Sequence, residues 1–429
     1  MCADFRHRRT LTGRQRVLKA INHESADCVA VDLGGTPCSG AHVSVIANLR
    51  RALGMDKAGE PVRVVEPYQM LGEVAADLRE ALGIDVVNLP SVKNMFGFAN
   101  ADWKPWRTFD GTDCLVPGDF NTKPAPNGDI LMHPQGDRSA PPSGRMPKGG
   151  YYFDSIIRQK PIDDAKLDPA DNLEEFRLIS EQDLAYYEQK AGELYESTDV
   201  AIAGNFGGMA FGDIALVPAP WLKDPKGIRD IEEWYISTIS RRQYISDVFA
   251  GQAEIAIKNL ERIYQAVGDK VQVLHMDGTD LASQNSLFCS PDTYRELYLP
   301  HSRKLNDWIH AYTKWKTIKH CCGGCEPLIE GFIDAGFDIL NPVQTSAKGM
   351  DPKRLVDKYG GRIVFWGGGV DTQQTLPFGT ADEVRRQVAE RVEIFGQTKG
   401  FVFNPIHNIQ CNTPVENVLA MFEALGRKV

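Results

Sequence analysis

Eight short apolar segments, separated by segments with a helical pattern, constrain the fold of this chain more than any other feature. They are rich in β-branched residues and are bounded by turns that contain Gly, Asn or Asp. Because they are continuously apolar, both faces of the sheet should be covered, and the intervening helices favour parallel pairing. The predicted strands are residues 28–33, 85–90, 200–205, 271–277, 315–320, 337–342, 362–367 and 400–405.

Amphipathic segments alternate with these strands. Thr12 is a candidate N-cap for the first of them. The predicted helices include residues 13–23, 241–266, 292–312, 325–335, 351–359 and 381–395. Eight βα units close most naturally into a (β/α)8 TIM barrel, which we predict as one domain over residues 1–429. A doubly wound open sheet is the alternative, but the first turn, "DLGGTPCSG", lacks the G-x-G-x-x-G spacing.

Residues from about 103 to 175 interrupt the alternation. This segment carries Pro and Gly throughout, "DGT" and "NGD" turn signals and short alternating runs. We therefore predict a β-hairpin-rich insertion between barrel strands two and three. An insertion beside a barrel mouth can form a lid or a docking surface, or can serve packing alone.

Composition limits the class of partner. The net charge is −9, which argues against nucleic-acid binding, and no apolar run is long enough to span a membrane. The first 25 residues lack the apolar core of a secretory signal, so the sequence predicts a cytoplasmic protein. The nine cysteines favour free thiols or metal ligands over a disulfide scaffold.

Polar residues follow the predicted strands, and in a barrel the carboxyl ends of the strands meet at one mouth. The candidate catalytic residues are Asp277, Asp280 and His407. The candidate substrate-binding residues are Asp32, His42, Asn205, Gln284, Asn341 and Gln344. The glycines of "WGGGVDTQ" (366–373) could cradle a phosphate or simply allow a sharp turn.

The segment "KHCCGGCEP" (319–327) is the strongest metal-binding candidate. His320 and Cys322 stand two residues apart at a strand end, so they can point the same way, whereas Cys321 points elsewhere. Nitrogen and thiolate ligands favour zinc, and three protein ligands with one open position are typical of a catalytic zinc site. The third ligand could be His407 or Cys411. A redox pair within "CGGC" is the competing interpretation.

Several segments resemble the uroporphyrinogen decarboxylase superfamily. They are "RQRVLKAINHESADCVAVDLGGT", "HMDGTDLASQN", "IKHCCGGCEPLIEGFIDAGFDILNPVQTSAKGMDPKRL", "VFWGGGVDTQQTLPFGT" and "FVFNPIHNIQCNTPVENVLAMFEAL". The resemblance implies a (β/α)8 barrel. The decarboxylases proper carry an R-Q-A-G-R segment after the first strand, where this chain has "DLGGTPCSGAHVSV" without an arginine. A substrate with several carboxylates needs such cations, so decarboxylation of uroporphyrinogen is not expected.

The resemblance is closest to the cobalamin-dependent methyltransferases of the superfamily, which carry an H-x-C zinc motif followed much later by a Cys. His320 and Cys322 match the first two ligands. The position of the last ligand, seven residues before Pro414, holds His407 rather than a Cys, and Cys411 lies four residues further on. The resemblance therefore implies Zn²⁺ held by His320, Cys322 and His407, with Cys411 as the alternative third ligand.

This resemblance implies a zinc-dependent methyltransferase that moves a methyl group between a small substrate and a corrinoid. An aromatic methyl ether is the preferred substrate class, so that the reaction would be an O-demethylation. The chain lacks a D-x-H-x-x-G cobalamin motif, so the corrinoid (cobalamin) is expected on a partner protein.

Two other functions stay open from the sequence. One is a cofactor-independent lyase that acts on a carboxylated small molecule, with Asp280 and His407 as acid and base. The other is an accessory protein that binds a corrinoid or tetrapyrrole. The sequence does not fix the oligomeric state, and a homodimer is one option.

Overall fold

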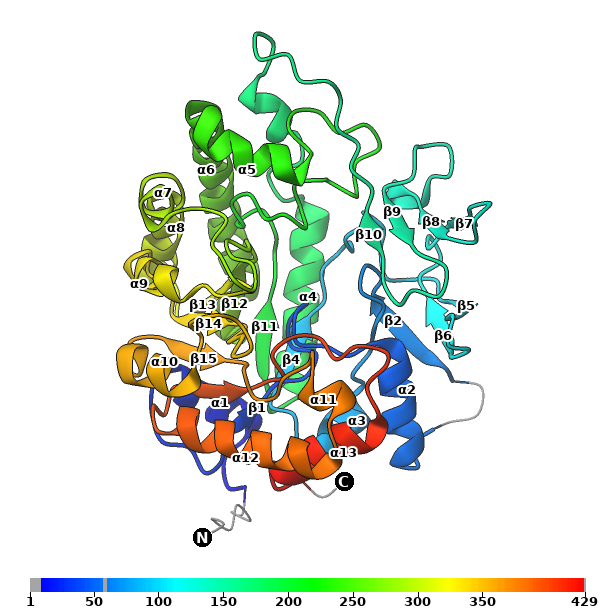
Figure 1. Ribbon diagram of the computed structural model, residues 1–429, viewed down its shortest axis with the longest axis vertical. Helices are drawn as coiled ribbons and strands as arrows, with labels where there is room; N and C mark the ends of the chain where they lie inside the picture. The colour runs from blue at the N-terminus through cyan, green and yellow to red at the C-terminus, as the bar shows by residue number, and fades with distance from the viewer. Residues whose placement is uncertain (1–8, 57–59, 428–429) are drawn as a thin grey trace.

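The computed structural model describes residues 9–56 and 60–427 (Figure 1). Cys2 and the other residues of 1–8, which begin the 25-residue segment considered above for a secretory signal, lie outside the described residues. Eight strands form one sheet in the order β1-β16-β15-β14-β13-β12-β11-β4, and its neighbouring strands are parallel. They are β1 (Ala30–Val31), β4 (Val86–Leu89), β11 (Ala201–Gly204), β12 (Val273–Asp277), β13 (Lys316–His320), β14 (Ile339–Asn341), β15 (Val364–Trp366) and β16 (Phe401–Phe403).

The predicted (β/α)8 barrel is confirmed, and each predicted strand segment contains one barrel strand. Helices surround the sheet, and within the described residues none is long and apolar enough to cross a membrane (Figure 1). The α-helices are α1 (Gly13–Ile21), α2 (Val43–Ala52), α3 (Ala76–Leu82), α4 (Glu181–Ser197), α5 (Ile231–Ser240), α6 (Arg242–Val267), α7 (Pro291–Thr293), α8 (Leu299–Tyr312), α9 (Glu326–Asp334), α10 (Pro352–Tyr359), α11 (Thr375–Phe378), α12 (Ala381–Gly396) and α13 (Val415–Ala424). A π-helical turn, Tyr294–Tyr298, joins α7 to α8.

The first helix, α1 (Gly13–Ile21), closes the amino-terminal end of the barrel. Thr12 caps it in a capping box with Gln15, as the sequence predicts for its N-cap. Val17, Ala20 and Ile21 join the apolar cluster that fills the barrel interior. Since this end is closed by packed side chains, the open end lies at the carboxyl ends of the strands.

The sheet is nearly closed rather than fully hydrogen-bonded. Among the described residues β1 and β4 end the strand order, and Asp85 joins them just before β4. Its N–H donates to Val31 O at 2.8 Å, and its Oδ2 accepts from Val31 N–H at 3.0 Å. Asp85 also forms a buried ion pair with Arg16 of α1 at 2.7 Å. The carboxylate therefore replaces part of the missing strand pairing.

Two small sheets stand beside the barrel (Figure 1). One is β10-β9-β8-β7, and the other is β3-β2-β6-β5. Phe96, Phe120 and Phe153 pack edge to face in the apolar cluster of this region. The strands are β2 (Val62–Glu66), β3 (Leu71–Gly72), β5 (Lys104–Arg107), β6 (Asp113–Val116), β7 (Thr122–Pro124), β8 (Ile130–Met132), β9 (Gly144–Met146) and β10 (Asp154–Ser155).

Most of these strands lie between β4 and β11 in the sequence, and consecutive ones from β7 to β10 pair antiparallel. The sequence did not predict that β2 and β3, which precede β4, would take part. β2 pairs with β6 in parallel. This contact joins chain segments about fifty residues apart, so local turn signals carry no trace of it.

Candidate metal centre

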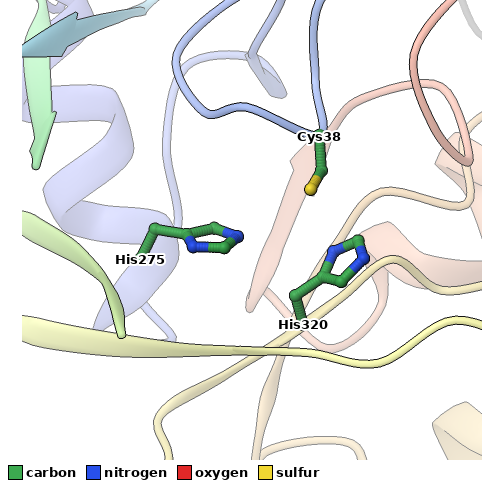
Figure 2. Close-up of side chains that lie close together, drawn as sticks. All are labelled: Cys38, His275 and His320. Atoms are coloured by element: carbon green, nitrogen blue, oxygen red, sulfur yellow. The ribbon is translucent and has the colours of Figure 1, made fainter. Parts of the chain in front are cut away.

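Side chains from separate strands and loops meet at the carboxyl ends of the barrel strands. His275 comes from β12, His320 ends β13, and Cys38 lies in the loop after β1 (Figure 2). Figure 2 shows the three side chains directed toward a common space. Ile318 belongs to the cluster inside the barrel, and His320 points to the same side because it lies two residues further along the strand.

His320, Cys322 and His407 form one group of potential metal ligands. One ligand atom from each lies within 4.8 Å of the others. His320 Nε2 and Cys322 Sγ are 3.4 Å apart, and the His320 and His407 ring centroids are 5.5 Å apart. Ligand atoms around a tetrahedral zinc ion lie roughly 3.3–3.8 Å apart. Small side-chain adjustments would therefore let these three atoms share one cation.

The hydrogen bonds of Asn341 fix the orientation of His320. The Asn341 amide donates from Nδ2 to Trp366 O at 2.8 Å, so its Oδ1 is left as an acceptor. His320 Nδ1 lies 2.7 Å from that oxygen and must carry the proton. His320 Nε2 is then the nitrogen with a free lone pair, on the side of Cys322. This is the arrangement by which a neighbouring polar group orients a metal-ligating histidine.

The loop after β13 is held by side chains from neighbouring loops. Cys322 N–H donates to Asp280 Oδ1 at 2.6 Å, and Gly323 N–H donates to Gln344 Oε1 at 2.6 Å. Gly323 has φ +87°, and a Cβ there would lie 2.5 Å from Ser283 O. Only glycine fits this turn. Cys321 does not belong to the group of potential ligands described above; its Sγ accepts from Leu281 N–H at 3.3 Å and donates to Cys322 O at 3.6 Å.

Cys38, His275 and His320 form a second group, whose ligand atoms also lie within 4.8 Å of one another. His275 is 7% exposed, and its Nε2 has no hydrogen-bond partner among the described residues. Sequence reasoning left His275 without a role and did not select Cys38. The available signal was the place of Cys38 in the Gly-rich turn directly after the first strand, at the barrel mouth.

Burial keeps the three histidines neutral. It lowers the pKa of His275 to about 3 and the pKa values of His320 and His407 to about 4. The neighbouring His320 ring adds to the lowering at His275 and His407. At neutral pH each imidazole therefore retains a lone pair that can bind a cation.

Burial raises the pKa values of the Cys38 and Cys322 thiols well above the usual range for cysteine, and nearby carboxylates add to this effect. Without a cation, two thiolates in this place would be strongly disfavoured. A bound metal ion would reverse that preference, because it stabilises the thiolate directly. The donor set thus fits a borderline-soft cation such as zinc.

Acidic residues surround the same centre. Asp280 Oδ1 lies 3.9 Å from His320 Nε2, and burial raises the pKa of Asp280. Asp213, which sequence reasoning missed, lies in the long loop after β11. Burial, together with the Asp280 and Asp277 charges, raises the pKa of Asp213 to about 8. A Cβ on Gly278 would lie 2.6 Å from Asp213 Oδ2, so this glycine admits the carboxyl group to the end of β12.

Asp277, which was predicted to be catalytic, lies in a network of buried contacts. Its Oδ1 lies 2.9 Å from Lys319 Nζ in a fully buried ion pair and accepts from Thr279 N–H at 2.8 Å. Lys319 also donates to Thr279 O at 2.9 Å. The register of β12 shifts between His275 and Asp277, so strict alternation does not hold there. The carboxyl group of Asp277 is therefore engaged with Lys319 and Thr279, and its catalytic role stays a prediction.

Three other candidates belong to neither ligand group and form hydrogen bonds with other residues. Cys411, the alternative third ligand, lies outside both groups, and its Sγ donates to Asp110 Oδ2 at 3.0 Å. His42 caps α2 through Nδ1, and its Nε2 bonds to Tyr151 O at 3.0 Å. Asp32 is buried and accepts from Trp366 Nε1 at 2.8 Å and from Gly35 N–H at 2.8 Å. These contacts support structural roles.

The amide candidates differ in their positions. Gln344 and Asn341 support the centre through the contacts described above. Gln284 bonds to Gln373 at 3.3 Å, and Asn205 accepts from Gly207 N–H at 3.2 Å. Gln284 and Asn205 stay predictions as substrate contacts.

The fold and this cluster define a (β/α)8 barrel with a candidate metal centre at its mouth. Residues 219–427 match the sequence model of the family described as uroporphyrinogen decarboxylase (URO-D). This segment includes β12 to β16 and with them His275, His320, Cys322 and His407. The expected resemblance to the uroporphyrinogen decarboxylase superfamily is thereby confirmed over this segment.

A solved structure of a methyltransferase from Methanosarcina mazei is similar in fold. It has a TM-score of 0.55 and 19% sequence identity, and the match covers 97% of this chain and 98% of that one. At this identity the similarity establishes the fold alone. No curated protein sequence matches this chain.

Proposed function

We propose that this protein is a zinc-dependent methyltransferase that moves a methyl group between a small substrate and a corrinoid carried by a partner protein. The observation that carries the proposal is the convergence of His320, Cys322 and His407 within 4.8 Å at the barrel mouth. The methyltransferase of similar fold and the family match are consistent with it.

The residues present fit a catalytic zinc ion. Two neutral imidazoles and one thiol supply nitrogen and sulfur donors, and three protein ligands leave a position for substrate. When bound, zinc would supply a Lewis acid that withdraws negative charge from the heteroatom bearing the methyl group. We assign His320, Cys322 and His407 as the ligands.

The surrounding residues would orient this centre and handle protons. Asn341 fixes the proton of His320 on Nδ1, and Asp280 holds the Cys322 backbone in place. The raised pKa of Asp280 lets its carboxyl retain a proton closer to neutral pH than an exposed aspartate does. Asp280 is thus suited to donate a proton to the leaving group or to take one from an incoming thiol or hydroxyl.

We further propose an aromatic methyl ether as the substrate class, so that the overall reaction is an O-demethylation. The methyl group would pass to a corrinoid on a partner protein, and the phenolic oxygen would keep the bonding electron pair and gain a proton. Gln284 and Asn205 are the proposed substrate contacts.

Metal analysis combined with a methyl-transfer assay tests this function. Purified wild-type protein should contain zinc, and His320→Ala should lose it, because His320 belongs to both ligand groups. His310→Ala is the matched control, since His310 lies at the surface on Asp338. The zinc-loaded wild type should methylate cob(I)alamin from an aromatic methyl ether, and His320→Ala should not.

Metal-free protein that retains full methyl-transfer activity would refute the proposal. Metal-free protein that decarboxylates a carboxylated small molecule would favour the lyase instead, with Asp280 and His407 as its acid and base.

A further inference from the structure

The second group of ligands raises a separate question. Sulfur and nitrogen atoms of Cys38, His275 and His320 also lie within 4.8 Å of one another, yet Cys38 and His275 have no part in the site proposed above. Figure 2 shows the side chains converging from the β1 loop, β12 and β13. Three separate chain segments must fold correctly to bring these atoms together.

His275 provides the independent sign of a ligand. Its side chain is buried, and Nε2 has no partner among the described residues although it is directed into the group. An unpaired buried nitrogen costs roughly 1–3 kcal/mol, so native proteins rarely leave one without a reason. A cation bound to Nε2 would remove this cost.

Cys38 is held in place by a network rather than by a flexible loop. Gly34 N–H donates to Ser39 O at 2.7 Å, and Thr36 N–H donates to Ser39 Oγ at 2.9 Å. Asn408 accepts from Gly40 N–H at 2.6 Å and donates to Pro37 O at 2.9 Å. The turn that carries Cys38 is therefore tied to the residue next to His407.

We propose that Cys38, His275 and His320 form a second cation-binding position. A zinc ion can bind there instead of at the position formed by His320, Cys322 and His407. A single cation takes one position or the other, because two divalent cations on one imidazole would repel each other strongly. The inference rests on the proposed metal centre but not on methyl transfer. With two positions that share His320, the cation can move between a ligand in the loop after β1 and a ligand in the loop after β13.

Cobalt binding tests this position through its thiolate ligand. Co²⁺ bound to a thiolate shows a charge-transfer absorption in the near ultraviolet, which Co²⁺ bound only by nitrogen and oxygen lacks. We expect Cys322→Ala to bind Co²⁺ and to retain a thiolate band, supplied by Cys38. Adding Cys38→Ala should abolish the band. Adding Cys28→Ala instead should leave it, because Cys28 lies against Arg427, away from both ligand groups.

A second test removes Cys322 and His407, the two ligands that belong only to the position formed by His320, Cys322 and His407. Cys322→Ala combined with His407→Ala should still bind Co²⁺ with the thiolate band, and adding His275→Ala should weaken binding at least tenfold. Circular dichroism and a cooperative thermal transition establish that each variant is folded. If the double variant does not fold, the single Cys322→Ala variant decides the question.

Two results would overturn the inference: loss of the thiolate band in Cys322→Ala, or its persistence after Cys38→Ala is added. Failure of the wild type to bind Co²⁺ would instead remove the proposed metal centre, and with it the proposed function.

Discussion

Replacing Asn341 should weaken metal binding although Asn341 is not a proposed ligand. In Asn341→Ala, His320 Nδ1 loses its acceptor at 2.7 Å, and Trp366 O loses its donor at 2.8 Å. His320 is then free to adopt the other tautomer, which puts the proton on Nε2 and removes the lone pair that faces Cys322. Loss of such a supporting contact typically weakens metal binding about 10-fold to 100-fold, or about 1.4–2.7 kcal/mol.

The measurement is zinc affinity by competition with a chelator, with unfolding followed by denaturant titration. Asn417→Ala is the matched control, because Asn417 is a buried amide that donates to Leu376 O at 2.9 Å and Gly379 O at 2.8 Å, away from the centre. Both variants should lose roughly 1–3 kcal/mol of stability from unpaired buried groups. Only Asn341→Ala should lose zinc affinity. Folded Asn341→Ala with wild-type affinity would refute the role assigned to this hydrogen bond.

Three further predictions concern the residues around the centre. The pKa of Asp213 is about 8 in the folded protein against 3.8 in the unfolded chain, so its contribution to stability is full below about pH 4 and is lost as pH rises through 8. Between about pH 5 and 8, the metal-free wild type should therefore lose on the order of 2–4 kcal/mol of unfolding free energy relative to Asp213→Asn. A wild-type urea midpoint that shifts no more than that of Asp213→Asn between the two pH values would contradict this. Lys319→Met leaves the Asp277 carboxylate buried without its cation and should lower the free energy of unfolding, measured by denaturant titration, by about 3–5 kcal/mol. A loss below about 1 kcal/mol would show that this ion pair does not stabilise the fold as described. Gly323→Ala forces a Cβ toward Ser283 O and should lower zinc affinity in a chelator competition, so unchanged affinity would disprove the need for glycine in this turn.

The barrel could be predicted because each strand carries its own signal. Segments such as 337–342 and 362–367 are continuously apolar, which is how a strand buried on both faces reads. His320 and Cys322 could be selected as a pair because two-residue spacing at a strand end is local information. The resemblance to known zinc motifs then pointed to His407, and the structure places it in the same group.

Other parts of the site depend on contacts that no local pattern encodes. Asp277 is the last residue of the strand that carries His275, but the register of β12 shifts between the two residues, and Asp277 pairs with Lys319. Asp213 comes from a long irregular loop, and its closeness to the centre depends on the absence of a side chain at Gly278. Cys38 lies in a turn that Asn408, far away in the sequence, helps to hold at the mouth.

The central claim is that one cation is held at the barrel mouth by imidazole and thiolate. X-ray absorption at the zinc edge of the purified, zinc-loaded protein measures this most directly. The account predicts mixed nitrogen and sulfur scattering, with zinc–sulfur bonds of about 2.3 Å and zinc–nitrogen bonds of about 2.0–2.1 Å, both lost in His320→Ala. A spectrum with oxygen and nitrogen neighbours alone, or one that His320→Ala leaves unchanged, would contradict it.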